Sequence, residues 1–395
     1  MRKTILTGFI IGILSLIAIV PVAIGASGDL IWTQASNPSS YDDYASAVAV
    51  DSTGVYVVGD DSYPGSTNTR WRMEKRNLTT GSVIWTQTSN PSSYVDSASA
   101  VAVDGTGVYI VGYDSYPGSG NARWRIEKRS LTDGSVIWVK ASNPSSYWDV
   151  ATGVAVDSTG VYIVGSDKYA DPSGRWRMEK RSLTDGSVIW TQASNPSIYR
   201  DEAYGVAVDG SGVYIVGYDN YFGCNFFGFC NSRWRMEKRS LTTGSKIWTN
   251  TSNASGYEDN AFGVAVDDTG VYTVGLDSYP GYGDARWRME KRNLTTGNSI
   301  WTKTSNASTS WDETTAITVG GAVYSVGSDS YPGDDRWRME KRSILSGTSL
   351  WTKTSNPSSS YDEAYGVAVD GSGVYIVGVD DYPGNGRWRI EKRVP

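Results

Sequence analysis

The chain has 395 residues and a formal charge of −6 at pH 7, from 36 basic and 42 acidic side chains. It contains no histidine and two cysteines, which excludes Ser–His and Cys–His nucleophiles, imidazole metal sites and a zinc site built from thiolates alone. The negative charge also argues against nucleic acid as a partner, because phosphate binding requires a basic surface.

The first 26 residues have the pattern of a secretory signal. Arg2 and Lys3 precede an apolar run over residues 5–24, and the small residues Gly25 and Ala26 follow it. We expect cleavage near these small residues, which would make the protein secreted or place it at the cell surface. The alternative is an uncleaved anchor, since about 20 apolar residues can span a bilayer, and this anchor would be the chain's only contact with a membrane.

The rest of the chain is one unit copied seven times. Each copy opens with a Trp, separated from the next by 50 to 58 residues, and carries a second Trp inside an Arg-Trp-Arg triplet. The opening residues are Trp32, Trp85, Trp138, Trp190, Trp248, Trp301 and Trp351. The triplet residues are Trp71, Trp124, Trp176, Trp234, Trp287, Trp337 and Trp388. A period of this length is typical of solenoids and propellers.

Each copy shows four short apolar, β-branched or alternating runs, which predict strands. In the first copy these strands cover residues 46–51, 55–59, 70–76 and 82–87. Turns containing glycine follow the first and third strands, and no run has a sustained helical period. Four-stranded units arranged radially form the blades of a β-propeller.

The two ends of the repeat region indicate how the ring closes. The chain after the signal begins with a lone fourth strand over residues 30–34. It ends on a third strand over residues 387–393, after strands at 366–370 and 373–378. The opening strand can complete the last blade, which removes exposed sheet edges. We therefore predict an all-β, monomeric, seven-bladed β-propeller with four antiparallel strands per blade, in a single domain over residues 27–395.

Two stretches of the repeat, VAVDSTGVYVVG and EKRSLTDGSVIW, carry a resemblance to known families. The unit resembles the seven-bladed β-propeller repeats of secreted or surface proteins of bacteria and archaea. It is similar, more distantly, to the PQQ-like repeats of quinoprotein dehydrogenases, which are typically eight-bladed with a calcium-bound quinone and an adjacent cysteine pair. Because this chain has seven copies, and Cys224 and Cys230 are not adjacent, we carry over no catalytic residue and expect no quinone cofactor.

Two loops of each copy would emerge on the same face of a propeller: strand four to the next strand one, and strand two to strand three. Both loops carry an aspartate in every copy. The first set is Asp43, Asp96, Asp149, Asp201, Asp259, Asp312 and Asp362. The second set is Asp61, Asp114, Asp167, Asp219, Asp277, Asp329 and Asp380. A tyrosine lies two residues after each member of the second set, at Tyr63, Tyr116, Tyr169, Tyr221, Tyr279, Tyr331 and Tyr382.

These repeated aspartates have a structural and a functional interpretation. An aspartate beside a turn accepts backbone N–H bonds, and the arginines of the triplets need acceptors if both faces of a blade are covered. We predict that Arg72 and its copies pair with these aspartates or with carboxylates of the Glu74 type. The functional alternative is a ring that binds Ca²⁺ or a polyol, since carboxylates suit Ca²⁺, and carboxylates with aromatic rings suit sugars. No Asp-x-Asp-x-Asp-Gly calcium loop occurs, and we expect no other metal.

The residue before each aspartate of the first set differs between copies, whereas we expect its neighbours to vary little. At this position Trp148, Arg200, Trp311 and Tyr361 are candidate ligand contacts, together with the aspartates that follow. Trp148 and Trp311 are the only tryptophans outside the repeat pattern. The alternative is that this loop position is simply unconstrained.

The fourth copy departs most from the others. Residues 221–230 replace a shorter loop and contain Phe222, Phe226, Phe227, Phe229, Cys224 and Cys230. In an exported protein the two cysteines are expected to form a disulfide. The phenylalanines either bind a partner or fold back over the rim as a local plug.

Glycosylation sequons also fit an exported protein. Five asparagines precede x-Ser or x-Thr with a middle residue other than proline: Asn77, Asn250, Asn253, Asn293 and Asn306. They are candidate glycosylation sites in a host that has the modification.

These features together predict a non-catalytic binding module, secreted or on the cell surface, for an extracellular glycan or a protein partner. The contact would be the loop face rich in Asp, Tyr and Trp. A carboxylate-based glycoside hydrolase or lyase is the enzymatic alternative, although we find no acidic pair that stands apart from the repeated ones. A purely structural envelope component is the third possibility, favoured if the apolar leader is retained.

Overall fold

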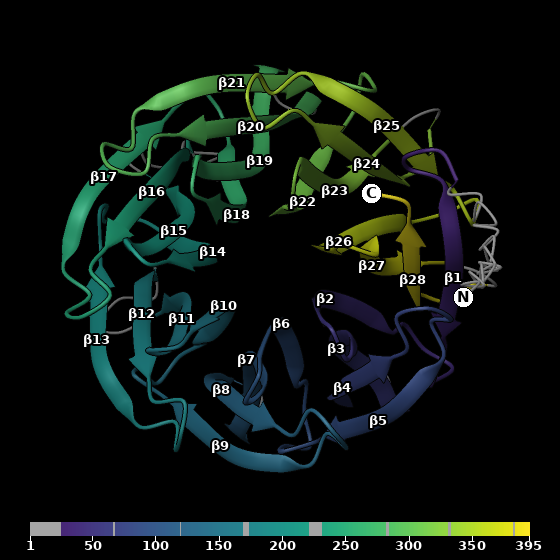
Figure 1. Ribbon diagram of the computed structural model, residues 1–395. Coiled ribbons are helices and arrows are strands. Elements are labelled where there is room, and N and C mark those ends of the chain that lie inside the picture. The colour runs from purple at the N-terminus through teal and green to yellow at the C-terminus, as the bar shows by residue number, and fades with distance from the viewer. Residues whose placement is uncertain are drawn as a thin grey trace, which may run out of the picture.

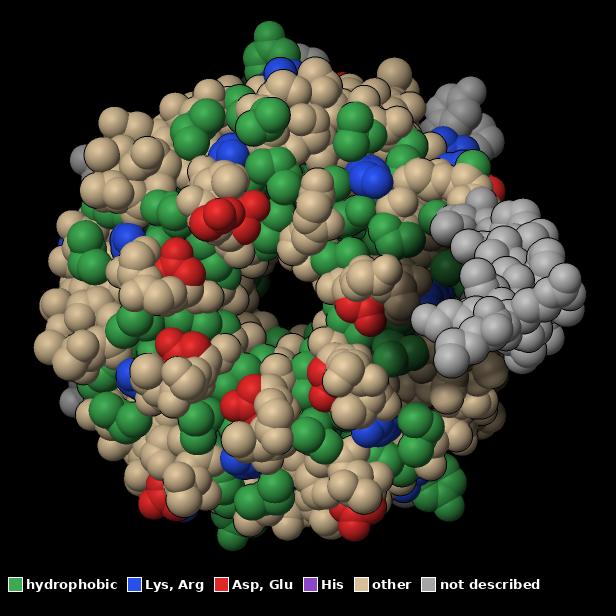
Figure 2. Space-filling model, viewed as in Figure 1, with side chains coloured by type: hydrophobic (Ala, Val, Ile, Leu, Met, Phe, Trp, Pro, Cys, Tyr) green, Lys and Arg blue, Asp and Glu red, His purple; other side chains and the backbone are tan. Residues whose placement is uncertain are grey.

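The protein is a ring of seven four-stranded antiparallel sheets around an open central channel (Figures 1 and 2). The computed structural model describes residues 25–65, 68–118, 120–168, 174–220, 231–281, 284–330, 333–381 and 384–395. Over these residues it contains 28 strands, so the predicted seven-bladed β-propeller is confirmed. We number the blades in chain order, and blade 7 is the one that contains both ends of the described chain.

The two inner strands of each blade come first in the sequence. The innermost strands line the channel: β2 (Tyr44–Asp51), β6 (Ser97–Asp104), β10 (Val150–Asp157), β14 (Asp201–Asp209), β18 (Asp259–Asp267), β22 (Glu313–Val319) and β26 (Asp362–Asp370). The second strands are β3 (Gly54–Gly65), β7 (Gly107–Gly118), β11 (Gly160–Asp167), β15 (Gly212–Asp219), β19 (Gly270–Gly281), β23 (Val323–Asp329) and β27 (Gly373–Asp380).

The two outer strands of each blade follow. The third strands carry the Arg-Trp-Arg triplets: β4 (Asn68–Arg76), β8 (Asn121–Arg129), β12 (Arg175–Arg181), β16 (Arg233–Arg239), β20 (Asp284–Arg292), β24 (Arg336–Arg342) and β28 (Arg387–Arg393). The outermost strands are β5 (Val83–Ser89), β9 (Val136–Ser142), β13 (Val188–Ser194), β17 (Lys246–Ser252), β21 (Ser299–Ser305), β25 (Ser349–Ser355) and β1 (Leu30–Ser36).

The first strand closes the ring as the sequence predicts. β1 pairs antiparallel with β28, from Leu30 opposite Arg393 to Ser36 opposite Trp388, and so completes blade 7. The pairing continues past the strands, because the Gly28 N–H donates to the Val394 carbonyl at 2.9 Å. The blade that joins the two ends of the ring is therefore built from both ends of the described chain (Figure 1).

The strands next to the channel are longer than the sequence pattern predicts. β2 begins at Tyr44, two residues before its predicted start, and its register with β3 shifts between Ala45 and Ala47. This β-bulge lets pairing continue through small polar residues that lack a clear apolar alternation. In blades 1, 2 and 5 the second strand extends past its aspartate to a glycine, as β3 does to Gly65.

Apolar side chains fill the space between neighbouring blades. Between blades 1 and 2, Tyr56, Trp71 and Met73 of the first pack with Val108 and Ile110 of the second. Period-two alternation on the third strand puts Trp71 and Met73 on this face and Arg72 on the other. The outer tryptophans link blades as well, as in the hydrogen bond from Trp85 Nε1 to the Leu131 carbonyl at 3.4 Å.

A repeated buried ion cluster holds each third strand. The Glu74 carboxylate binds Arg72 at 2.7 Å and Arg76 at 2.5 Å, and Arg72 also reaches Asp61, at 3.5 Å. Every blade has this arrangement, so the predicted pairing of the triplet arginines is confirmed. Because each buried carboxylate has two cations, the interior of a blade carries no unbalanced negative charge at this position.

The described residues contain no helix with the length and apolar character needed to cross a membrane.

The close packing of the two inner strands yields a first prediction. A Cβ on Gly112 would lie 2.1 Å from the backbone oxygen of Ser97, whereas a Cβ on Gly105, in the turn of the same hairpin, would meet no atom within 4 Å. We expect Gly112→Ala to lower the free energy of unfolding by at least about 2 kcal/mol. Gly105→Ala should change it by less than about 0.5 kcal/mol. Thermal and denaturant unfolding measure both, and equal stability of the two variants would contradict the packing described here.

Candidate functional site

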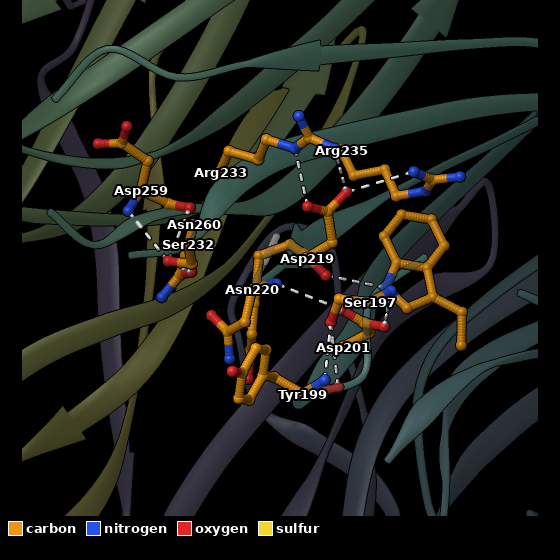
Figure 3. Close-up of polar contacts among 12 residues, drawn as sticks. Ser197, Tyr199, Asp201, Asp219, Asn220, Ser232, Arg233, Arg235, Asp259 and Asn260 are labelled. Atoms are coloured by element: carbon orange, nitrogen blue, oxygen red, sulfur yellow. Dashed lines mark hydrogen bonds and ion pairs between the residues drawn. The ribbon is translucent and has the colours of Figure 1, made fainter. Parts of the chain in front are cut away.

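The aspartates of the first set tie together the two loops on one face of each blade. In blade 4 the Asp201 carboxylate accepts hydrogen bonds from the Ser197 N–H at 3.0 Å and the Ser197 hydroxyl at 2.7 Å. It also accepts one from the Asn220 N–H at 3.2 Å, in the other loop (Figure 3). Burial raises the pKa of Asp201, and these hydrogen bonds oppose that rise. The two loops of a blade therefore meet at one carboxylate.

All seven aspartates of this set are fully buried: Asp43, Asp96, Asp149, Asp201, Asp259, Asp312 and Asp362. Their oxygens face donors of their own loops, as the structural interpretation expects. A ligand on the surface of the rim would have to reach past these loops to touch them.

The aspartates of the second set are also buried, and they bind arginines. Asp219 accepts from Arg233 at 2.8 Å and lies 3.2 Å from Arg235 (Figure 3). The tyrosines after these aspartates are exposed where they are described: Tyr63, Tyr116 and Tyr279 are each about half exposed and stack on an arginine. The other four, Tyr169, Tyr221, Tyr331 and Tyr382, lie outside the described residues.

The residues on either side of each first-set aspartate share the opposite face of the strand, because side chains alternate with a period of two. In blades 4 to 7 these two residues bond to each other. Arg200 binds Glu202 at 2.7 Å, and Asn260 donates to Glu258 at 2.7 Å. Trp311 Nε1 donates to Glu313 at 2.9 Å, and the Tyr361 hydroxyl donates to Glu363.

Aromatic side chains two positions further along the same strands extend this surface into the channel. The Tyr204 hydroxyl donates to Glu202 at 2.9 Å. The Tyr204 ring lies 5.1 Å from that of Phe262 and 5.7 Å from that of Tyr218, in β15. In blade 7 the hydroxyls of Tyr365 and Tyr361 are 3.1 Å apart. Tyr204, Phe262 and Tyr365 line a channel cavity of about 350 Å³. Tyr361 also lines a depression of about 740 Å³ between blades 6 and 7.

We call this surface the acidic–aromatic sector. It comprises four carboxylates, six aromatic residues, one arginine and one asparagine of blades 4 to 7. The residues are Arg200, Glu202, Tyr204, Tyr218, Glu258, Asn260, Phe262, Trp311, Glu313, Tyr361, Glu363 and Tyr365.

Sequence reasoning identified Arg200, Trp311 and Tyr361 as candidate contacts and missed most of the other sector residues. The expectation that the neighbours of the variable position vary little is wrong, because the residue after each aspartate is Tyr44, Ser97, Val150, Glu202, Asn260, Glu313 or Glu363. The third residue after each aspartate varies as well: it is Ser46, Ser99, Thr152, Tyr204, Phe262, Thr315 or Tyr365. Aligning the seven copies at the aspartate, with the strand period in mind, would have found both positions.

Glu313 and Glu363 form an acidic pair that stands apart from the repeats, which corrects the expectation that no such pair exists. Burial, and next the negative charge of Glu313, raise the pKa of Glu363 to about 7. Burial also raises the pKa of Glu313, and the charge of Glu258 adds to the rise. The carboxylates of blades 5, 6 and 7 therefore influence one another across the loop-rich end of the channel.

Blades 1 to 3 have a different surface at the same positions. Trp148 packs against Tyr113, with ring centroids 5.2 Å apart, and Asp42 accepts a hydrogen bond from the Gly386 N–H at 2.8 Å. The structure thus brings Arg200, Trp311 and Tyr361 into one sector and places Trp148 outside it.

The opposite end of the channel is acidic for a structural reason. Figure 2 shows acidic side chains around the opening and lysines or arginines further out. The turns between the two inner strands supply such groups, as when Asp51 accepts from the Thr53 and Gly54 N–H groups at 2.7 and 3.0 Å. Lys75 donates to the Thr53 hydroxyl at 2.9 Å, so each such turn brings a cation close to its carboxylate.

The remaining candidate residues fall into two groups. Phe222, Phe226, Phe227, Phe229, Cys224 and Cys230 lie outside the described residues. Of the sequon asparagines, Asn253, Asn293 and Asn306 are exposed, and Asn77 and Asn250 are half-buried. Within the described ranges no three acidic or cysteine side chains are arranged to hold a metal ion.

No family model and no curated protein matches this chain. Among solved structures, the chain is similar to the quinohemoprotein alcohol dehydrogenase ADHIIG of Pseudomonas putida HK5, with a TM-score of 0.48 and 11% sequence identity. The match covers 93% of this chain and 76% of that enzyme. The dehydrogenase activity belongs to that protein and is not carried to this chain.

The raised pKa of Glu363 predicts a pH-dependent stability. A carboxyl group whose pKa is higher in the folded protein than in the unfolded chain favours folding at low pH, and that benefit is lost as the pH rises through the folded value. The contribution of protonated Glu363 to the free energy of unfolding is therefore lost between about pH 4.5 and 7. Glu363→Gln should therefore match the wild type in stability near pH 4 and exceed it at pH 8, by on the order of 1–3 kcal/mol.

Thermal unfolding at both pH values measures this effect. Glu202→Gln is the matched control, because it breaks the ion pair with Arg200 and should give no gain at pH 8. Parallel stability–pH curves for the wild type and Glu363→Gln would show that Glu363 titrates as an ordinary exposed carboxyl group.

Proposed function

We propose that this protein is a non-catalytic binding module, secreted or held at the cell surface, that takes a glycan at the acidic–aromatic sector. The observation that carries the proposal is the gathering of non-repeated aromatic and carboxylate residues at one end of the channel. The repeated aspartates of the same rim are buried and serve the loops. The sector residues depart from the repeat and are absent from the apolar clusters that pack the blades together, so selection for a ligand can account for them.

The chemistry of the sector suits carbohydrates. Sugars present apolar ring faces that stack on aromatic side chains, and hydroxyl groups that donate to carboxylates. Trp311 and Glu313 place both features within one hydrogen-bonded pair, and Tyr361 with Glu363 does so in the next blade. A sugar lying across blades 6 and 7 could use both pairs.

The extracellular placement rests on the sequence. Residues 1–24, which contain the apolar run, lie outside the described residues, and the next residues run directly into the closing strand β1. An exported propeller would present its loop-rich end to glycans of an envelope or a neighbouring cell.

Removing the tryptophan of the sector tests the proposal. We expect Trp311→Ala to weaken binding of a glycan identified on an array by about tenfold or more, because a stacking ring and a donor to Glu313 are lost. Trp148→Ala is the matched control, since Trp148 holds the same position in blade 3, outside the sector, and is half-buried as Trp311 is.

Isothermal titration calorimetry measures both affinities. If Trp148→Ala loses binding and Trp311→Ala retains it, the binding site lies at Trp148 in blade 3 and not in the sector. The failure of a broad glycan array to detect any ligand would overturn the proposed function.

A second candidate function is favoured by the Glu313 and Glu363 pair. Burial raises the pKa values of both carboxyl groups, and the charge of Glu313 adds to the rise at Glu363. Two such groups could act as acid and base in glycoside cleavage. The enzyme alternative therefore has a specific location, at the loop-rich end of the channel in blades 6 and 7.

Hydrolysis assays on polysaccharides test this alternative. If the protein releases reducing ends, Glu363→Gln should lower the rate by about 100-fold or more. Asp60→Asn is the control, because Asp60 is a carboxyl group in blade 1 whose pKa burial also raises to about 7. Equal activity of the two variants would exclude Glu363 as the acid, and the absence of released ends from every polysaccharide leaves the binding function as the conclusion.

A further inference from the structure

We propose that the glycan bound at the acidic–aromatic sector carries free amino groups, so that the protein selects amino sugars in their ammonium form over neutral, N-acetylated or acidic sugars. This inference rests on the proposed function and names its ligand class. Its support is the charge of the sector, the surroundings of each carboxylate and the aromatic lining of the channel.

The carboxylates of the sector differ from those of the arginine clusters inside the blades. Each of the seven glutamates of the Glu74 type binds two arginines, and each second-set aspartate binds at least one. Among the described residues, Glu258, Glu313 and Glu363 have no cation within ion-pair distance. Their bonded partners are Asn260, Trp311, Tyr361 and Tyr365.

The one cation of the sector is already used. Arg200 binds Glu202 at 2.7 Å, in blade 4, and Glu202 also accepts from Tyr204. Blades 5 to 7 therefore present three carboxylates without a counter-charge. These carboxylates also repel one another, since Glu258 acts on Glu313 and Glu313 acts on Glu363. A bound cation would relieve this repulsion and would gain charge-assisted hydrogen bonds.

An ammonium group fits this surface better than a metal ion. A metal ion needs several oxygen ligands converging at short distance, and no such group exists within the described ranges. An ammonium group instead forms separate hydrogen bonds and is attracted to aromatic faces. Phe262 and Tyr365 line the channel beside Glu313, and Tyr361 faces the depression between blades 6 and 7 together with Asp334 and Asp335.

The same surface disfavours related sugars. An N-acetyl group removes the positive charge while the ring and its hydroxyls remain, so stacking persists and the ionic contribution is lost. A sugar carboxylate would add a further negative charge to three that lack a counter-ion, which costs affinity. The sector should thus rank amino sugars above N-acetylated sugars and both above acidic sugars.

The test compares glucosamine oligosaccharides with their fully N-acetylated counterparts of equal length, by isothermal titration calorimetry at pH 7. We expect the amino form to bind about tenfold tighter or more, and we expect added salt to reduce this preference. The double variant Glu313→Gln/Glu363→Gln should lose the preference while still binding the N-acetylated form. Thermal unfolding of each variant confirms that it is folded.

Asp268→Asn is the matched control. It removes one negative charge from an exposed turn between the inner strands of blade 5, at the opposite end of the channel, and should keep the full preference. Equal affinity for the two oligosaccharides would overturn the inference and leave the proposed function standing. A preference that survives in the double variant, or disappears in Asp268→Asn, would also overturn it. If neither oligosaccharide binds but another glycan does, the ligand class is wrong, and if no glycan binds, the proposed function itself fails.

Discussion

The rim of this propeller depends on one buried carboxylate in each blade. The aspartate that precedes or opens the innermost strand accepts hydrogen bonds from both loops on its face, as Asp201 does from Ser197 and Asn220 (Figure 3). A buried carboxylate without hydrogen-bond donors lowers the free energy of unfolding. Moving either loop away from the aspartate would therefore destabilise the protein. The same arrangement repeats in every blade, so the described parts of the two loops are held at equivalent points around the ring.

The position of this aspartate decides which neighbouring residues can vary between blades. Because the aspartate points inward, the residues before and after it point the other way and are absent from the apolar clusters between the blades. Blades 4 to 7 use these positions for hydrogen-bonded pairs such as Arg200 with Glu202 and Trp311 with Glu313. Blades 1 to 3 use them for contacts such as Trp148 against Tyr113. An asymmetric surface is thus built on a symmetric frame.

The two ends of the channel show the same contrast in their charges. At one end, the acidic turns between inner strands are capped by their own backbone, and lysines such as Lys75 lie close by. At the other end, each of Glu258, Glu313 and Glu363 has its own polar partner, and none of these partners carries a positive charge. Acidic composition alone does not distinguish the two ends, whereas the partners of each carboxylate do.

The sequence by itself determined the architecture of this protein. Seven copies with four strand runs each, a lone fourth strand at the start and three strands at the end specify a closed ring, because strand periodicity and turn chemistry are local properties. The pairing of Arg72 with Asp61 and Glu74 also followed from the alternation along one strand. Only the tertiary structure decided that Glu313 raises the pKa of Glu363, which lies 50 residues further along the chain. That effect depends on the packing of successive blades side by side, which brings equivalent positions of their innermost strands together around the channel.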